Sequence, residues 1–270
     1  MKTNYLLRRM GWALALLGLA GGRAGAQPRP GKTMDSSDQT MFSQPAPLSQ
    51  LQLTPGNFRL TVHGAGGHLA ERDRDQTQRA SAGSEESSPL VGVAMAGLYA
   101  IDDRFFVTGG GLFVKATSDR LAGQLAGGTV GGGLRIAGGP DDRFILGAVL
   151  GLFVARSTVE PATLRGLSVT GTAIAGAVQA EIVVLPWLSV VPYANLLRLV
   201  SVSLDREGIG PTVEKDLAKT LVMPGLDVWI YTAGDHQHGH FSLGGNTTLG
   251  QQSKTTLFTL GHTFSFGGGG

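Results

Sequence analysis

The stretch LVGVAMAGLYAIDDRFFVTGGGLFVK, residues 90–115, decides the fold of this chain. Two glycine-rich apolar segments of strand length, Leu90–Ile101 and Arg104–Thr117, flank the acidic pair Asp102-Asp103. Aspartate favours a tight turn because its side chain hydrogen-bonds its own backbone. The first segment alternates with period two, which predicts a strand with one apolar and one small-residue face. The apolar face holds Val91, Val93, Met95, Tyr99 and Ile101.

The same unit recurs along the chain. Tight turns begin near residues 102, 141, 186 and 235, and longer polar loops separate the pairs of segments. A propeller blade would place four shorter strands in a similar period, whereas only two long segments fit here. The ten segments are Phe58–Leu69, Leu90–Ile101, Arg104–Thr117, Thr129–Gly138, Arg143–Ser157, Val169–Val184, Leu188–Ser203, Thr220–Thr232, His240–Thr248 and Lys254–Phe266.

Segment length distinguishes strand from helix. Phe144–Ala155 is uncharged, and as a helix it would span about 18 Å, short of the roughly 30 Å hydrocarbon core. A tilted strand needs only about 9–11 residues to cross. A closed barrel also pairs every backbone group between strands. The sequence therefore predicts an all-β, transmembrane, antiparallel up-and-down β-barrel of about ten strands, with eight or twelve as alternatives.

The N-terminus has the pattern of an export signal. Lys2, Arg8 and Arg9 precede the apolar run Met10–Ala20, and small residues surround a cleavage point after Ala26. We therefore expect a bacterial outer-membrane protein with four parts. These are a signal peptide (1–26), a flexible periplasmic N-terminal segment (27–56), the barrel (57–266) and a glycine tail (267–270).

Charge and cysteine content exclude several function classes. The whole chain carries 22 Lys plus Arg and 20 Asp plus Glu, but residues 1–26 hold four of the cations and no acid. The remainder is therefore 18 against 20, and nothing favours a nucleic-acid partner. The absence of cysteine excludes disulfides, thiolate zinc sites and cysteine nucleophiles.

The C-terminal segment carries a family resemblance. In Leu257–Phe266 the alternating residues are Phe258, Leu260, His262, Phe264 and Phe266. This pattern resembles the closing strand of small bacterial outer-membrane β-barrels of the outer-membrane-protein-A-like or porin-like superfamily. The resemblance implies outer-membrane lipids and the barrel-assembly machinery as partners, with Phe258, Leu260, Phe264 and Phe266 as the assembly signal. Four glycines, Gly267–Gly270, follow the terminal aromatic residue.

Ionisable residues on the predicted inner faces form the candidate site. They are Arg59, His63, Arg135, Glu181, Arg198 and Asp227. A charge at membrane depth must pair or meet water. We expect Glu181, Arg198 and Asp227 to form an ionic network across the lumen, with Arg135 or Arg59 opposite. Aromatic residues near segment ends are typical of an interfacial girdle. They are Tyr99, Trp187, Tyr193, Trp229 and Tyr231.

Metal and catalytic chemistry receive little support. His236, His238 and His240 would share one face of a strand and are weak metal candidates, but a solvated polar turn is the favoured interpretation. The strand count is similar to that of omptin-type proteases, which need acidic and histidine residues at the outer rim. Here only His68 lies near such carboxylates, at Asp73 and Asp75, and no catalytic residue is assigned.

The sequence thus predicts a non-enzymatic outer-membrane barrel without a cofactor, with a narrow lumen filled by side chains. Its role would be structural or surface interaction, with the loops 71–88 and 204–219 facing outward toward an extracellular ligand. A small passive pore or transporter and a rim-located hydrolase are the alternatives. A soluble secreted all-β protein also stays open.

Overall fold

All regular structure in the described part of the computed structural model is β-strand. The structure describes residues 54–71, 86–117, 122–139, 142–159, 167–206, 210–215, 220–232, 239–249 and 253–267. The strands are β1 (Phe58–Glu71), β2 (Glu86–Ala100), β3 (Phe105–Thr117), β4 (Ala122–Ala137), β5 (Phe144–Val159), β6 (Leu167–Leu185), β7 (Leu188–Arg206), β8 (Gly210–Lys215), β9 (Thr220–Tyr231), β10 (Gly239–Leu249) and β11 (Ser253–Phe266). No helix among these residues is long and apolar enough to cross a membrane.

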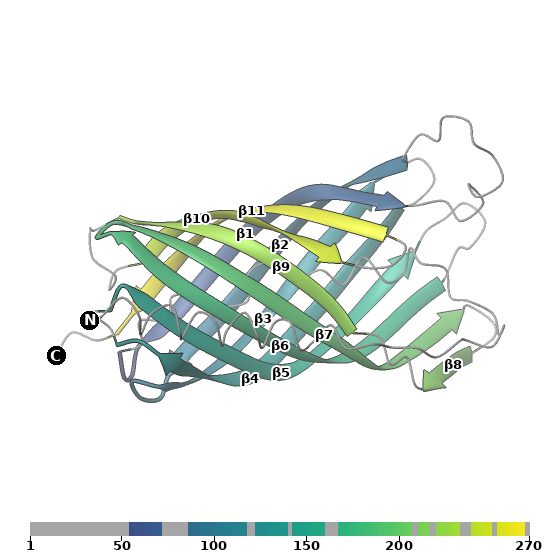
Figure 1. Cartoon of the computed structure of the whole chain (residues 1–270). Coiled ribbons are helices and arrows are strands. Elements are labelled where there is room, and N and C mark those ends of the chain that lie inside the picture. The colour runs from purple at the N-terminus through teal and green to yellow at the C-terminus, as the bar shows by residue number, and fades with distance from the viewer. Residues whose placement is uncertain are drawn as a thin grey trace, which may run out of the picture. The chain divides into compact units, whose positions relative to one another are not determined.

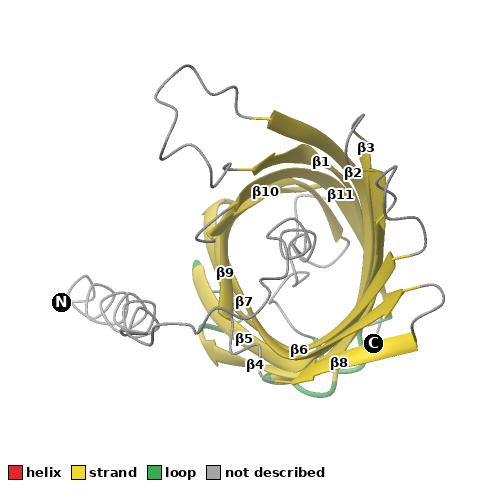
Figure 2. Cartoon of the chain, turned by 90° about the vertical axis from the view of Figure 1, so that its right-hand side faces the viewer, coloured by secondary structure: helices red, strands yellow, loops and turns green. Residues whose placement is uncertain are grey.

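Ten of the strands close into an antiparallel ring. The order is β6-β5-β4-β3-β2-β1-β11-β10-β9-β7, and pairing between β6 and β7 completes the circle. The first strand β1 lies between β2 and the last strand β11, so no edge of the ring is left open (Figures 1 and 2). The predicted ten-strand all-β barrel is therefore confirmed.

The region predicted as the loop 204–219 contains additional strand. β7 continues to Arg206, and the short strand β8 pairs with it outside the ring. β4 also begins earlier than predicted, at Ala122, because Gly123–Gly128 pairs in register with β5. Residues 72–85 of the predicted loop 71–88 and residues 1–53, with the proposed signal peptide, lie outside the described residues.

The ring is sheared by twelve residues. A row of Cα partners that starts at Ala70 on β1 passes through every strand of the ring and returns to β1 at Phe58. Ten strands with a shift of 70 minus 58 residues correspond to a strand tilt of about 40°. From one strand to the next along such a row, the paired residue therefore lies closer to the tight-turn end of the barrel by 12/10, or 1.2, residue lengths.

The outer surface carries the predicted apolar stripes. Val91, Leu150 and Val130 are each about two-thirds exposed, and the stripes of β6 and β9 also face outward. Tyr99 and Trp187 lie at the tight-turn end of this surface, together with Phe58, Phe105, Phe264 and Phe266. An apolar band with aromatic residues at its border is typical of a barrel that spans lipid.

Three aromatic residues predicted for the girdle point inward instead. Tyr193, Trp229 and Tyr231 are at most 5% exposed and lie on the lumenal face of β7 and β9. The prediction that they belong to the girdle is wrong, because closeness to a strand end sets height in the barrel but not the face. On β9, Trp229 and Tyr231 alternate with outward residues such as Leu226 and Ile230, and this alternation determines which face a side chain takes.

Glycines on β3, β4 and β5 allow close packing of the wall. A Cβ on Gly131 would lie 2.5 Å from the Leu150 carbonyl oxygen and 2.8 Å from the Cα of Gly151. Aromatic rings cover two further inward glycines, with Phe153 over Gly127 and Phe106 over Gly133. These glycines therefore leave room for rings to lie flat on the inner wall, a recognised device in curved sheets.

Adjacent glycines on β4 give a matched test of this packing. Gly131→Ala should lower the free energy of unfolding by about 1–3 kcal/mol, because the added methyl group meets backbone atoms. Gly132→Ala should change it by less than about 0.5 kcal/mol, since its nearest neighbour would be the Phe106 carbonyl oxygen at 3.7 Å. Urea unfolding of the refolded barrels measures both, and equal losses would contradict the close-packing account.

Candidate functional site

The barrel lumen is divided into two chemically different layers. An apolar layer lines the half next to the long loops. In the half next to the tight turns, buried polar side chains line the arc from β6 to β1, and a second apolar cluster of Leu98, Ala100, Phe106 and Ile145 lines β2, β3 and β5. The apolar layer consists of Leu90, Leu112, Val114, Ala116, Leu125, Phe153, Ala155, Ala173, Ala175, Leu197, Leu199, Leu221, Met223 and Leu257. The polar side chains of the tight-turn half form the polar layer, which consists of Arg59, Thr61, Glu181, Ser189, Trp229, Tyr231, His240 and Thr263.

Glu181 is the centre of the polar layer. Its side chain is fully buried, and its Oε1 accepts hydrogen bonds from Ser189 Oγ at 3.0 Å and from the Tyr231 hydroxyl at 2.5 Å. The three residues lie near the tight-turn ends of β6, β7 and β9, at positions that the strand alternation turns inward. A carboxylate held by two hydroxyl donors in low dielectric makes stronger hydrogen bonds than it would in water.

Arg59 reaches Glu181 from the opposite wall. β1 and β6 are five strands apart in either direction around the ring. Arg59 is 1% exposed, and its guanidinium lies within electrostatic reach of both Tyr231 and Glu181. The charges of Arg59 and Glu181 thus act on each other across the lumen, and this electrostatic interaction forms a bridge between opposite walls.

Hydrogen bonds and stacked rings continue the polar layer toward β1. Thr61 Oγ1 is 2.9 Å from Thr263 Oγ1, which in turn lies 3.2 Å from His240 Nε2. The His240 ring stacks on Trp229 at 4.4 Å and meets Tyr231 edge-on at 5.3 Å. Adjacent strands β1, β11, β10 and β9 thus join their inward side chains into one packed unit.

Asp227 lies between the two layers. Its side chain is 1% exposed and lies against Gly244, where a Cβ would come within contact distance of the carboxylate. The Tyr193 hydroxyl and the Trp229 side chain approach the carboxylate without reaching standard hydrogen-bond geometry. His63, three strands away on β1 at a similar level, has Nε2 3.3 Å from Ser242 Oγ on β10.

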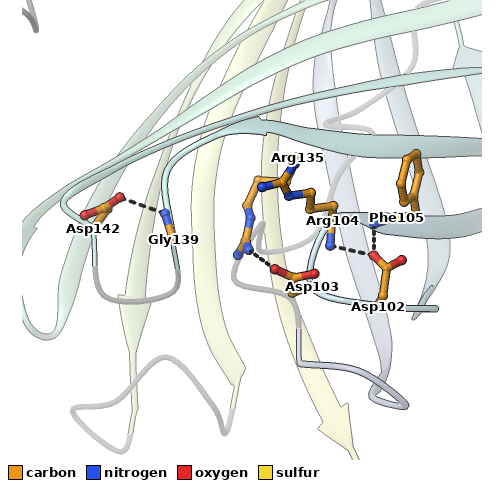
Figure 3. A network of polar contacts seen from close by, with 7 residues as sticks. All are labelled: Asp102, Asp103, Arg104, Phe105, Arg135, Gly139 and Asp142. Atoms are coloured by element: carbon orange, nitrogen blue, oxygen red, sulfur yellow. Dashed lines mark hydrogen bonds and ion pairs between the residues drawn. The ribbon is translucent and has the colours of Figure 1, made fainter.

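Arg135 belongs to the tight-turn mouth and not to the polar layer. One of its guanidinium nitrogens is 3.5 Å from the Asp103 carboxylate in the turn between β2 and β3 (Figure 3). In the same turn Asp102 Oδ1 accepts hydrogen bonds from the backbone N–H groups of Arg104 and Phe105. The next turn repeats this device, with Gly139 N–H donating to Asp142.

Five of the six predicted lumenal residues are buried on inward faces: Arg59, His63, Arg135, Glu181 and Asp227. The prediction for Arg198 is wrong, because its side chain is exposed on the outer face of β7. Its neighbours Leu197 and Leu199 point into the apolar layer. Both faces of β7 are apolar at this height, so alternation gave no contrast from which to assign the charge to a face.

Sequence reasoning missed the polar partners that join the charged residues. Ser189, Tyr231 and His240 each lie an even number of residues from other inward-facing positions on the same strand. This spacing was the signal that would have found them. Their roles depend on contacts between strands far apart in the sequence. Tyr231 and Glu181, for example, are separated by 50 residues.

One of the three predicted histidine candidates lies among the described residues. His240 lies in the polar layer, whereas His236 and His238 fall outside the described residues. Across the described ranges, no group of three or more His, Asp or Glu residues is arranged to hold a metal ion. His68 is exposed on the outer face of β1, away from the lumen.

The proposed assembly signal lies on the lipid-facing side of β11. Phe258 and Leu260 are each 63% exposed, and Phe264 and Phe266 are about half exposed. The His262 ring lies on the same face, 4.4 Å from both Phe241 and Phe264. The placement leaves the stripe accessible on the outside of the strand that pairs with β1.

Comparison with known proteins gives likenesses of overall structure alone. No protein-family model matches the chain, and no curated protein matches it. Among solved structures, the outer membrane protease OmpT from Escherichia coli has a TM-score of 0.49 at 8% identity, covering 79% of this chain and 98% of its own. The translocator domain of the autotransporter NalP from Neisseria meningitidis has 0.45 at 10% identity, covering 85% and 92%. Neisserial surface protein A has 0.37 at 10% identity, covering 78% and 99%.

These likenesses are too weak to indicate an activity. The architecture itself is that of an outer-membrane β-barrel: a closed, tilted antiparallel ring with an apolar exterior and a partly polar interior.

Replacing Glu181 tests the bridge across the lumen. Glu181→Gln keeps the shape but leaves the buried Arg59 without its opposite charge, so the free energy of unfolding should fall by about 3 kcal/mol. Asp103→Asn at the exposed mouth should cost less than about 1 kcal/mol. Urea midpoints of the refolded barrels compare the two, and a Glu181→Gln loss no larger than that of the control would refute the bridge.

Asp102 should titrate below its ordinary range. The Phe105 and Arg104 N–H groups hold the pKa of this carboxyl below the usual 3.8, because both stabilise the ionised form. The stabilisation is present above the unfolded pKa and is lost as the pH falls through the folded value. NMR titration of the folded barrel and of the urea-unfolded chain measures the difference, and identical values would contradict the turn hydrogen bonds.

Proposed function

We propose that this chain is a non-enzymatic outer-membrane barrel, exported by a signal peptide cleaved after Ala26, that acts in surface structure or surface interaction. The observation that supports this best is the bridge from Arg59 on β1 to Glu181 on β6. In this proposal the bridge and the polar side chains around it close the lumen at the tight-turn end. A barrel closed in this way presents its loops to the outside and passes no bulk solution.

The outward segments 71–88 and 204–219 are the proposed contact with an extracellular ligand. In the second segment, the pairing of β7 with β8 forms a two-stranded element beyond the ring of the barrel (Figure 1). Paired backbone in such an element positions side chains better than an unpaired loop does. Folding through the assembly machinery, guided by the Phe258 to Phe266 stripe, is part of the same proposal.

Catalysis is disfavoured by where the reactive side chains lie. His68, the rim histidine considered for hydrolysis, is on the lipid-facing surface. The pair formed by His63 and Ser242 is buried within the barrel wall, with both residues at most 5% exposed. General acid–base work needs a substrate within hydrogen-bond reach of the base, and neither position offers this.

A passive transporter for small apolar solutes is the second candidate. The apolar layer in the loop-side half of the lumen favours it, because a water-filled pore would be lined by polar groups. A small cavity of about 60 Å³ lies beside this layer, lined by residues that include Leu112, Phe153 and Ala175. Its volume is well below that of the roughly 150 Å³ engineered cavity that holds benzene.

Planar-bilayer recording tests the closed lumen. The wild-type barrel should insert without conductance steps, because the polar layer blocks the ion path. Arg59→Ala combined with Glu181→Ala should produce steps by removing both ends of the bridge. Asp103→Asn at the mouth should stay silent, and steady wild-type conductance would overturn the proposal in favour of the pore.

A further inference from the structure

Three cations point outward at the loop-side end of the barrel. Lys115 on β3, Arg156 on β5 and Arg198 on β7 all have exposed side chains on the lipid-facing surface. They occupy every second strand of the ring, and the pairing register places the Cα atoms of Lys115 and Arg156 roughly 12 Å apart and those of Arg156 and Arg198 roughly 16 Å apart. His68 occupies the corresponding outward position on β1.

The shear of the ring brings these three residues to one level. The row of Cα partners that begins at Ala70 passes through Leu196 on β7, Leu150 on β5 and Val107 on β3. Arg198 lies two residues nearer the loops than Leu196, Arg156 lies six residues nearer than Leu150, and Lys115 lies eight residues nearer than Val107. Their strands are four, six and eight steps along that row. The row drops by 1.2 residues per step (12 residues over ten strands). At each of the three strands this drop exceeds the cation's distance above the row by about one to three residues. The three cations therefore agree in height within about two residues.

The level of these cations is the border of the apolar band. Below them the outer surface is apolar, with Val91, Phe113 and Val154 exposed, down to the aromatic girdle at the tight-turn end. The band between Val91 and the level of Phe58 is about nine residues high on tilted strands, or roughly 25 Å, which matches the lipid-facing band of such barrels. Lipid headgroups therefore lie at the height of the cations.

Among the side chains that the structure describes at this border, the exposed charges are all positive. Among the described side chains, no carboxylate forms an ion pair or hydrogen bond with Lys115, Arg156 or Arg198. Arg156 instead receives support from Ser168, whose Oγ is 3.3 Å from the guanidinium. At the opposite mouth, by contrast, Arg104 and Arg143 each follow an acidic pair in the sequence. Within the described ranges, the loop-side cations therefore have no carboxylate partner.

We propose that Lys115, Arg156 and Arg198 form a binding site for the phosphate groups of membrane lipids in the leaflet at the loop end. Gln124, which pairs with Lys115 and is exposed on the same face, adds an amide donor between the first two cations. Arginine and lysine bind phosphate oxygens through charge-assisted hydrogen bonds. Acyl chains of the same lipid lie along the apolar band beneath, so headgroup and tail bind one continuous surface.

Native mass spectrometry of the full chain in mixed micelles tests this site. The micelles contain equal amounts of phosphatidic acid and phosphatidylcholine, and the retained lipids are counted. The wild-type barrel should retain phosphatidic acid preferentially, and added salt should reduce the preference by screening. Each substitution among Lys115→Gln, Arg156→Gln and Arg198→Gln should weaken it roughly fivefold, and the triple variant about a hundredfold.

Matched variants separate this site from general charge. Arg104→Gln with Arg143→Gln removes two exposed cations at the other mouth and should leave the preference unchanged. Arg156→Lys with Arg198→Lys keeps the charge and should retain most of it, while heat-modifiable migration verifies that every variant folds. Equal retention of both lipids by the wild type, an equal loss in the Arg104 and Arg143 control, or displacement by inorganic phosphate would each overturn the proposal.

Discussion

The requirement that every backbone N–H and C=O within lipid be paired governs this structure. Unpaired groups in hydrocarbon cost several kcal/mol each, and a sheet satisfies them all only by closing on itself. Here closure is achieved when β11 pairs with β1 along the whole of β1, and when β6 pairs with β7 at the other end of the sheet order. The shear of this closure sets the strand tilt and decides which side chains share a level.

Closure also creates an interior that must be filled. On β4 the inward glycines Gly127 and Gly133 are covered by Phe153 of β5 and Phe106 of β3. At the tight-turn end of the arc from β6 through β9, β10 and β11 to β1, buried polar side chains take this role, and Arg59 interacts electrostatically with Glu181 across the lumen. A buried pair of opposite charges is tolerated because each partner offsets the desolvation of the other. The two halves of the wall thus solve the same packing problem with different chemistry.

The exterior depends on the same geometry. The apolar stripes are continuous because alternate residues of every strand face lipid, and the cations on β3, β5 and β7 share a level because the shear aligns them. Arg198 illustrates the point, since its strand neighbours Leu196 and Leu197 are both apolar while they lie on opposite faces. Which face a residue takes there depends on the register with β6 and β9, including the irregularity between Thr172 and Ala173.

Local patterns in the sequence determined the strands, their turns and most of their faces. Alternation in Leu90–Ile101 and the acidic turn after it act between near neighbours, so they are legible without a fold. The tertiary structure alone decided which side chains meet: Tyr231 with Glu181, Arg59 with the opposite wall, and Arg198 with the outer surface. These contacts join residues far apart in the chain, and their heights follow from the shear of the closed ring, which no single segment encodes.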